Sequence, residues 1–289
     1  MRGDHQLILY KDVEQRFIMI KKAGFFLLSG VIILYCTGPF LWQFITSLKP
    51  DSELTRIPPI LPLLPTSAHY ITIFSQHTFL RIILNSMIVA ASTTVLALTI
   101  GSFAAFGLGK LKIKRKTLIL GFILSVSMFP PIATVSPLYI IIRSLGLRDT
   151  VWALIITYTT FSLPLSIWIL TNFIREIPDE IYSAARIDGC SRFQAFYRII
   201  LPLSAPGIVT TAILVFIFSW NEFLFALTFT STPASRTIPV GIALFPGLHE
   251  VPWGDIAAAS IVVTIPLILL VFVFQKRIVE GLTSGAVKG

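Results

Sequence analysis

Long apolar runs alternate with short polar segments along the whole chain. An α-helix needs about 20 consecutive apolar residues to cross the hydrocarbon core of a bilayer. Within lipid, a helix also satisfies its own backbone hydrogen bonds. The pattern therefore predicts an all-α, polytopic membrane protein with six transmembrane helices, at about residues 23–48, 81–108, 117–142, 151–172, 203–230 and 256–274.

Prolines interrupt three of these predicted spans. Pro130, Pro131 and Pro137 lie in the third, Pro164 in the fourth and Pro266 in the sixth. Proline removes a backbone donor and bends a helix. Such bends suit a protein with an internal path, and they are equally typical of ordinary packing kinks in membrane helices.

Composition and charge agree with a membrane protein. Hydrophobic residues make up 55% of the 289 positions and charged residues only 13%, while a soluble domain averages about 25% charged residues. A net charge of +9 is compatible with nucleic-acid binding, but the charges lie at the ends of apolar runs, as topology determinants do. We therefore expect membrane lipid, and not nucleic acid, around this chain.

The distribution of basic residues predicts the orientation. Segment 1–22, loop 110–116, stretch 173–202 and the C-terminal end together contain 17 of the 23 Lys and Arg residues. By the positive-inside rule these segments are cytoplasmic, including both termini. The expected organisation is a cytoplasmic N-terminal segment (1–22), a six-helix transmembrane domain (23–278) that includes the cytoplasmic loop 173–202, and a cytoplasmic tail (279–289). The apolar run after Lys22 is too long for the h-region of a signal peptide, so we expect an uncleaved first span in a cell inner or plasma membrane.

The stretch 183–202 reads SAARIDGCSRFQAFYRIILP and has the pattern of two short helices. Pro178 with acidic residues after it is typical of a helix start, and Gly189 can adopt the left-handed conformation that ends a helix. Ser191 and Gln194 then form a capping-box pattern. The second helix places Phe193, Phe196, Tyr197 and Ile200 on one apolar face. Such an amphipathic element lies on the membrane surface or docks in a groove of a partner, and its composition leaves both open.

The spacing of small and apolar residues in this stretch resembles a known motif. Ala184-Ala185, Gly189, Ile199 and Leu201-Pro202 have the spacing of the EAA loop in permease subunits of bacterial and archaeal ABC importers. The resemblance implies the MetI-like permease fold and a coupling helix seated in a cleft of a cytoplasmic ATPase. Ser183 stands where the family most often has glutamate, which puts one acid–arginine contact in doubt, and Glu180 is a candidate substitute. The ATPase-coupling residues implied are Glu180, Ser183, Ala184, Ala185, Asp188, Gly189 and Phe193.

Further segments are similar to the carbohydrate subfamily, in particular to maltose and trehalose permeases. They are Asn85-Ser86, Met128-Phe129-Pro130, Trp220-Asn221-Glu222-Phe223 and the C-terminal QKRIVEGLTSGAVKG. The resemblance implies a disaccharide or glucosylated solute, such as trehalose, maltose or glucosylglycerol, as substrate. The implied partners are a second homologous permease subunit, an ABC ATPase dimer and an extracytoplasmic sugar-binding protein or lipoprotein. In such permeases the tail reaches toward the ATPase, which implicates Gly285 and Lys288; the alternative is a frayed terminus.

Polar residues inside predicted spans are candidates for the substrate path, because intramembrane polar groups are costly. Asn85, Tyr158, Asn221 and Glu222 are expected at similar depth in the outer half of the membrane. The alternative is interhelical hydrogen bonding, which is common for polar residues in membrane helices. For Glu222, contact with the external binding protein or a gating role is an equal alternative.

The motifs of catalysis are absent from the sequence. It contains no G-x-x-x-x-G-K-[ST] phosphate loop, so we expect no ATP hydrolysis by this chain and no bound cofactor, with ATP and Mg²⁺ on the partner ATPase. The four histidines lack ligand spacing, so no metal site is expected. The alternatives are a secondary transporter or channel, which needs an ionisable residue at mid-membrane, and a membrane enzyme, which needs a nucleophile and base within the spans.

Overall fold

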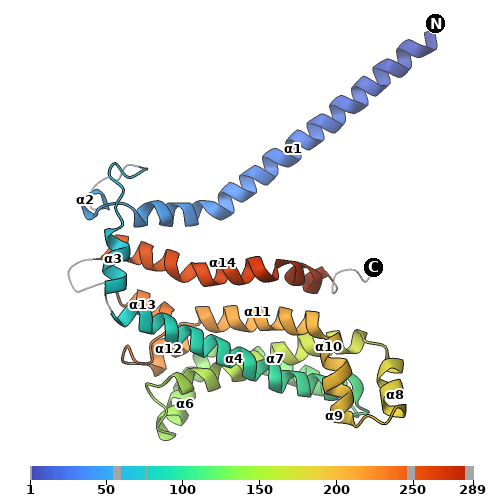
Figure 1. Cartoon of the computed structure of the whole chain (residues 1–289), viewed down its shortest axis with the longest axis vertical. Helices are drawn as coiled ribbons and strands as arrows, with labels where there is room; N and C mark the ends of the chain where they lie inside the picture. The colour runs from blue at the N-terminus through green and yellow to red at the C-terminus, as the bar shows by residue number, and fades with distance from the viewer. Residues whose placement is uncertain (1, 55–59, 76, 246–250, 284–289) are drawn as a thin grey trace. The chain divides into compact units, whose positions relative to one another are not determined.

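The computed structural model describes residues 2–54, 60–75, 77–245 and 251–283 (Figure 1). No strand occurs in these ranges, and the prediction of an all-α protein is confirmed. The elements are α1 (Arg2–Ser47), α2 (Asp51–Leu54), α3 (Ala68–Ser75), α4 (His77–Lys110), α5 (Lys116–Ser127), α6 (Pro131–Ser144), α7 (Val151–Glu176), α8 (Asp179–Ile187), α9 (Arg192–Ala195), the π-helix η1 (Phe196–Ile200), α10 (Leu201–Leu203), α11 (Ala205–Asn221), α12 (Leu224–Phe229), α13 (Ile238–Ala243) and α14 (Trp253–Thr283).

The chain divides into two compact units. The first comprises Met1–Tyr70 with Trp253–Ile261, and the second Ile71–Pro252 with Val262–Gly289. Within the first unit, the segment after α1 folds back on the end of that helix. The Ser47 hydroxyl lies 2.7 Å from the Tyr70 hydroxyl, and Thr66 N–H donates to the Leu48 carbonyl at 2.9 Å.

Within the second unit, α4, α7 and α11 lie side by side and form the centre (Figure 1). Small residues let these helices approach closely, as is usual between membrane helices. A Cβ added at Gly101 of α4 would lie 3.3 Å from Ser166 Cβ of α7, and one at Gly207 of α11 would lie 2.4 Å from the Phe173 ring of α7. This layer carries α8, α9 and η1 at one end and α12 and α13 at the other.

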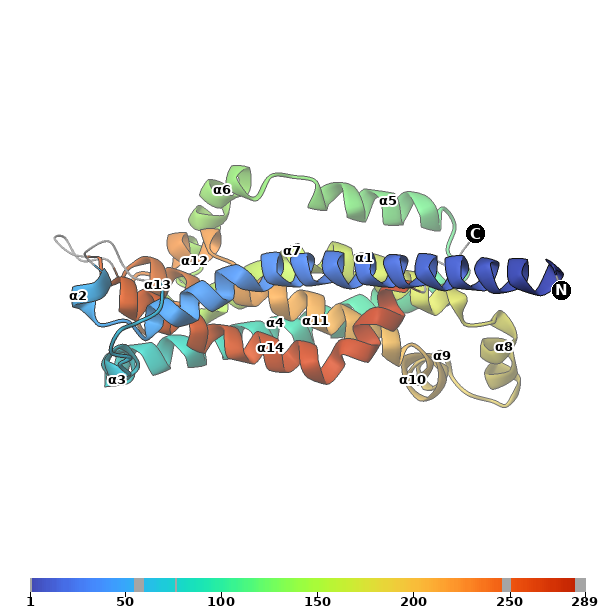
Figure 2. The ribbon, with the colours of Figure 1, turned by 90° about the horizontal axis from the view of Figure 1, so that it is seen from above.

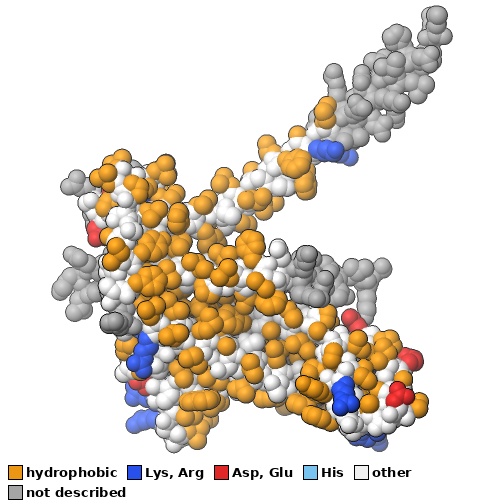
Figure 3. Space-filling model, in the orientation of Figure 1, with side chains coloured by type: hydrophobic (Ala, Val, Ile, Leu, Met, Phe, Trp, Pro, Cys, Tyr) orange, Lys and Arg blue, Asp and Glu red, His pale blue; other side chains and the backbone are white. Residues whose placement is uncertain are grey.

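The number of spans agrees with the prediction once broken helices are paired. Among the described residues, four helical segments are long and apolar enough to cross a membrane: Lys21–Ser47, Thr78–Lys110, Val151–Glu176 and Trp253–Gln275. Two bent pairs, Lys116–Ser127 with Pro131–Ser144 and Arg192–Leu203 with Ala205–Asn221, raise the number to six if each pair counts as one span. Hydrophobic side chains cover most of the face of the second unit that Figure 3 shows, and charged ones gather at its ends.

The structure confirms that prolines interrupt the third predicted span, 117–142, and it divides this span into two helices. Helix α5 ends at Ser127 and α6 begins at Pro131, with an angle of 87° between them (Figure 2). Pro130 is extended, with φ −60° and ψ 125°, because a residue that precedes a proline is excluded from the helical region. Two consecutive prolines therefore end one helix and start the next, whereas the isolated Pro137, Pro164 and Pro266 lie inside continuous helices.

The fifth predicted span, 203–230, is also divided. Helix α11 covers Ala205–Asn221, and the chain breaks at Glu222 before the short α12. Glu222 accounts for this break, because its Oε1 accepts from Phe225 N–H at 2.9 Å and its Oε2 from Ala226 N–H at 3.2 Å. A carboxylate that binds the free N–H groups of a first turn favours a new helix start.

Candidate functional site

The stretch 178–202 forms two short helices joined by a tight turn, as the sequence predicts. Helix α8 begins after Pro178 with Asp179 and Glu180 in its first turn. It ends at Ile187, and Gly189, two residues later, has a φ of +86° in the left-handed region. Asp188 N–H donates to the Ala184 carbonyl and Cys190 N–H to the Ala185 carbonyl. These hydrogen bonds satisfy the last carbonyl groups of α8, as glycine-terminated helices generally do.

The start of α9 confirms the predicted capping box. Gln194 N–H donates to Ser191 Oγ at 3.1 Å, and Ser191 N–H donates to Gln194 Oε1 at 2.7 Å. The two residues satisfy each other's backbone donors, so the entry into α9 is fixed by local contacts alone.

The aromatic face predicted for this second helix is divided in the structure. Phe196 and Ile200 are buried against α4 and α7, where Phe196 contacts the rings of Phe103 and Phe106. Phe193 and Tyr197 are about 62–63% exposed, and Phe193 stacks on Phe103 at 6.2 Å between ring centroids. Residues 196–200 form a π-helix, which changes the side-chain register expected from 3.6 residues per turn. The buried pair anchors this segment to α4.

Most of the residues implicated in ATPase coupling lie on the surface. Ala185 lies on the buried face of α8, and Phe193 contributes to the stacked pair just described. The others are exposed residues that are available to a partner: Glu180, Ser183, Ala184, Asp188 and Gly189. Gly285 and Lys288 of the tail lie outside the described residues.

An ion pair that the sequence did not indicate ties α8 to the end of α4. Lys110 Nζ donates to the Ile177 carbonyl and to Asp179 Oδ1, the latter at 2.6 Å. The Lys110 side chain is only 1% exposed, whereas the Asp179 side chain is 82% exposed. The hydrogen bond and positive charge of Lys110 lower the pKa of Asp179. A buried ammonium group is costly unless paired, so this contact fixes α8 relative to α4.

The substrate-path candidates occupy separate environments in the second unit. Asn85 of α4 is buried, and its Nδ2 donates to the carbonyl groups of Pro233, Ala234 and Arg236 at 3.0–3.2 Å. Asn221 is exposed at the end of α11 and donates to the Ile217 carbonyl at 2.8 Å. These bonds give both amide groups a structural role, and their part in a substrate path stays a prediction.

Tyr158 and Glu222 lie near the break between α11 and α12. Tyr158 is fully buried in a cluster with Phe225, Ala226 and Phe229, and its hydroxyl interacts with the Glu222 carboxylate. Glu222 is half-buried and caps α12. Among the four candidates, Tyr158 and Glu222 are therefore the two that the structure brings together, and their part in a substrate path stays a prediction.

A second unpredicted cluster joins the loop before α7 to the segment between α12 and α13. Asp149 accepts from the backbone N–H groups of Ser231 and Thr232, from the Thr232 hydroxyl at 2.8 Å and from the Ser235 hydroxyl at 2.5 Å. Partial burial by itself would raise the pKa of Asp149, but these hydrogen bonds outweigh it and hold the pKa far below its usual value. We call this group the Asp149 clasp.

We expect Asp149→Asn to loosen the Asp149 clasp. Asparagine has the same shape and tolerates the left-handed conformation of this residue, φ +61°, so the substitution removes chiefly the charge. A hydrogen bond to a charged acceptor contributes about 1.5–3 kcal/mol to the stability of the folded state, and partial exposure of the acceptor reduces this contribution toward about 1 kcal/mol. Hydrogen exchange at Ser231 and Thr232 should therefore be about 5-fold to 10-fold faster in the variant; unchanged exchange would contradict this role.

The Asp149 clasp also predicts a dependence on pH. A carboxyl with a lowered folded-state pKa stabilises the fold fully above its unfolded value of about 4, and the stabilisation is lost as pH falls through the lower folded value. Protection at Ser231 and Thr232, corrected for intrinsic exchange, should be flat from about pH 5 to 8 and should fall only below about pH 4.

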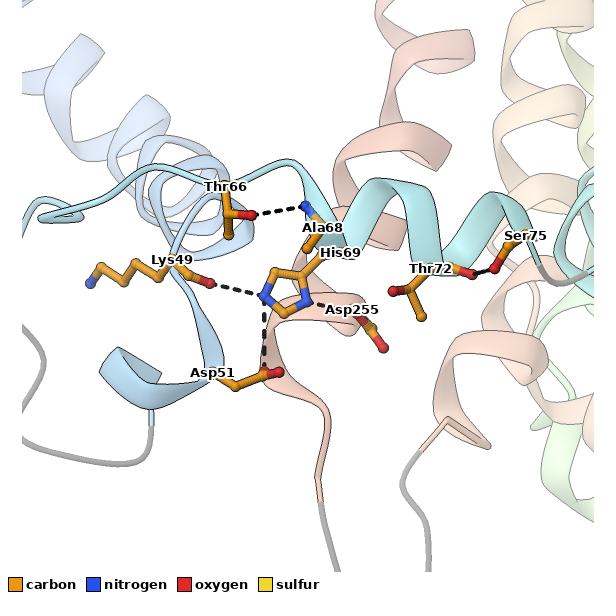
Figure 4. A network of polar contacts seen from close by, with 8 residues as sticks. All are labelled: Lys49, Asp51, Thr66, Ala68, His69, Thr72, Ser75 and Asp255. Atoms are coloured by element: carbon orange, nitrogen blue, oxygen red, sulfur yellow. Dashed lines mark hydrogen bonds and ion pairs between the residues drawn. The ribbon is translucent and has the colours of Figure 1, made fainter.

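His69 in the first unit belongs to a polar network that its isolated position in the sequence did not suggest (Figure 4). Its Nδ1 lies 2.7 Å from Asp255 Oδ1 and its Nε2 lies 2.9 Å from the Lys49 carbonyl oxygen, with an Asp51 carboxylate oxygen 3.9 Å from Nε2. The ring joins α3, the segment after α1 and the first turn of α14.

Comparisons with known proteins agree on one family. Residues 97–284 match the family model described as "Binding-protein-dependent transport system inner membrane component". The chain is 47% identical over 264 residues to the trehalose transport system permease protein SugB of Mycobacterium tuberculosis, covering 91% of this chain and 96% of that protein. It is 42% identical over 282 residues to the trehalose/maltose transport system permease protein MalG of Thermococcus litoralis, covering 96% and 99%.

A third relative and a solved structure extend the match. The chain is 41% identical to the sulfoquinovosyl glycerol transport system permease protein SmoH of Agrobacterium fabrum, covering 91% of this chain and 93% of that protein. The fold is shared with a chain in the crystal structure of a bacterial ABC transporter involved in the import of alginate, with a TM-score of 0.77, 22% identity and coverage of 90% and 96%. The predicted resemblance is thereby confirmed, and this chain belongs to the family of inner-membrane permease components of binding-protein-dependent transport systems.

Proposed function

We propose that this chain is a transmembrane permease subunit of an ATP-driven importer, and that it translocates a sugar delivered by an extracytoplasmic binding protein. The observation that carries the proposal is the exposed surface of α8 on a loop that is anchored to the helical layer by the Lys110–Asp179 ion pair and by Phe196. The protein is not expected to be an enzyme, and ATP hydrolysis would belong to a separate subunit.

The anchored loop suits the transmission of movement. An ATPase that closes on ATP would push against exposed Glu180, Ala184 and Asp188, with Ser183 in place of the usual glutamate. Because Lys110 and Phe196 connect the loop to α4, displacement of α8 would move the end of α4 and with it the packed helices. Only a difference in the ATPase's affinity for the inward-open and outward-open states can drive such a switch. The tail residues Gly285 and Lys288 are proposed as a second contact with the ATPase.

The relatives suggest the substrate class. Three are named for the transport of trehalose, trehalose/maltose or sulfoquinovosyl glycerol, and all of these are sugars or glycosides. A further structural relative is an alginate transporter in complex with its pentasaccharide-bound periplasmic protein. We infer a disaccharide or glucosylated solute as substrate, a binding protein as donor and a second permease subunit as partner. Tyr158 and Glu222, together with Asn85 and Asn221, are the candidates on this chain for the substrate path.

Transport by the reconstituted complex tests the proposal. The chain is placed in liposomes with its second permease subunit and ATPase, and uptake of labelled trehalose, maltose and glucosylglycerol is measured with the binding protein present. We expect uptake of one of these solutes only with hydrolysable ATP, and no uptake with an ATPase variant that binds ATP but does not hydrolyse it.

The same assay distinguishes the alternative. A secondary transporter would take up solute without the ATPase and would respond to an ion gradient or an uncoupler. Uptake by this chain alone, driven by such a gradient, would overturn the importer proposal.

A further inference from the structure

A cavity of about 530 Å³ lies between the end of α4, the segment before α5 and the helices α8 and α9. Its wall includes five basic side chains and one acidic side chain: Lys110, Lys112, Lys116, Arg186, Arg192 and Asp179. The hydroxyl-bearing Ser183 and the apolar Ile113 also line it. A concave surface with this composition favours a negatively charged ligand.

The one acidic side chain in this wall, Asp179, already forms an ion pair. Asp179 pairs with the buried Lys110, so neither contributes a free charge to the cavity. Arg186 donates to the Cys190 carbonyl, and Lys116 lies 3.5 Å from the Gly109 carbonyl oxygen, but neither contact neutralises charge. Within the described part of the chain, no carboxylate forms an ion pair with Lys112, Lys116, Arg186 or Arg192. Four like charges around one cavity repel each other, and a bound anion would relieve that repulsion.

The cavity lies at the level where apolar spans give way to polar loops. Lys110 is the last residue of the apolar segment Thr78–Lys110, and Lys116 is the first residue of α5. Beyond Lys116, the apolar side chains of Leu118 and Phe122 are 66% and 73% exposed, as expected for lipid-facing positions. Basic residues at the ends of membrane helices lie near the headgroups, and basic pockets at this level bind anionic headgroups.

We propose that this cavity binds the phosphate group of an anionic phospholipid. Lys112 and Arg192 would provide charge from its two sides, the Ser183 hydroxyl would donate a hydrogen bond, and Ile113 would contact the apolar part of the lipid. The cavity is large enough for a whole phosphoglycerol headgroup and exceeds what a single carboxylate side chain of a protein partner requires. A bound lipid would connect the 110–116 segment to α8 and α9. The proposal does not depend on the transported solute.

Binding of phosphatidylglycerol to the full chain in detergent, measured by native mass spectrometry, tests the proposal. We expect Lys112→Gln/Arg192→Gln to weaken phosphatidylglycerol binding about 30-fold, since each basic residue near a headgroup contributes roughly a factor of five. The matched control, Lys114→Gln/Arg198→Gln, removes the same charge from exposed neighbours that do not line the cavity, and should change binding less than about 2-fold. The conservative pair Lys112→Arg/Arg192→Lys should retain binding and shows that a loss does not reflect misfolding.

Three outcomes would overturn the proposal. Equal losses in both double variants would indicate attraction by net charge only. Displacement of the lipid by inorganic phosphate at about millimolar concentration would indicate a site for a soluble anion. If lipid binding is unchanged but ATPase association is lost in Lys112→Gln/Arg192→Gln alone, the cavity accepts an acidic side chain of the ATPase.

Discussion

Gly189→Val should reduce solute uptake by the reconstituted complex about 10-fold or more, while the chain still inserts and assembles. Gly189 has a φ of +86°, which β-branched residues avoid. The left-handed region costs an ordinary residue about 1–2 kcal/mol. No atom outside the neighbouring residues lies within 4 Å of an added Cβ, so the effect comes from the backbone. The strain would shift the turn and displace the exposed face of α8 from the ATPase.

Two variants serve as controls for the Gly189 substitution. Gly189→Asn adds a side chain of similar size, but asparagine tolerates the left-handed conformation, so uptake should stay within about 2-fold of the unmodified chain. Gly121→Val makes the same substitution within α5, where an added Cβ also meets no atom within 4 Å. Uptake by this variant should likewise stay within about 2-fold of the unmodified chain. If Gly189→Val and Gly189→Asn behave alike, the conformation of this turn does not matter for coupling.

Asp179→Asn should be the second damaging substitution, because it leaves the ammonium group of Lys110 buried without its carboxylate. Removing one partner of a buried pair is costly, but Asp179 is itself exposed, so water can partly replace it. We expect hydrogen exchange in 178–192 to increase about 10-fold and ATPase stimulation by the solute-loaded binding protein to fall by a similar factor.

A double-mutant cycle separates the ion pair from unrelated effects of each substitution. Lys110→Met keeps the apolar length of the side chain and removes the buried charge, so Lys110→Met/Asp179→Asn should exchange more slowly than Asp179→Asn alone. Asp188→Asn, an exposed acid on the same loop without an ion-pair partner among the described residues, is the charge-matched control and should leave exchange in 178–192 unchanged. Additive effects of the two substitutions in the cycle would show that the contact contributes nothing.

The sequence was sufficient where the deciding contacts are local. The turn at Gly189 and the capping box of Ser191 and Gln194 involve residues within a few positions of one another, and both have the predicted geometry. The sequence also predicted an interruption at Pro130-Pro131, but it did not predict how sharp the break is, with 87° between α5 and α6. A single proline costs a helix one hydrogen bond, whereas a proline that precedes another is itself held out of the helical region.

The prediction of one aromatic face over residues 193–200 was only half right, for a different reason. Helical periodicity predicts which residues share a face, but the π-helix at 196–200 changes the register after Phe196. Which of these side chains is buried depends on the packing against α4. Phe196 and Ile200 pack against this helix, whereas Phe193 stacks on Phe103 and Tyr197 stays exposed.

By itself, the sequence determined the all-α class, the apolar segments and the turn at Gly189 between α8 and α9, because chain-local hydrophobicity and backbone preferences decide these features. The tertiary structure alone decided which charged and polar residues from distant parts of the sequence meet. Lys110 and Asp179 are 69 positions apart, Asp149 and Ser235 are 86 apart, and His69 and Asp255 are 186 apart. A sequence pattern does not show how distant helices are aligned with one another. Contacts between residues this far apart in the sequence can therefore be identified only once the packing of the helices is known.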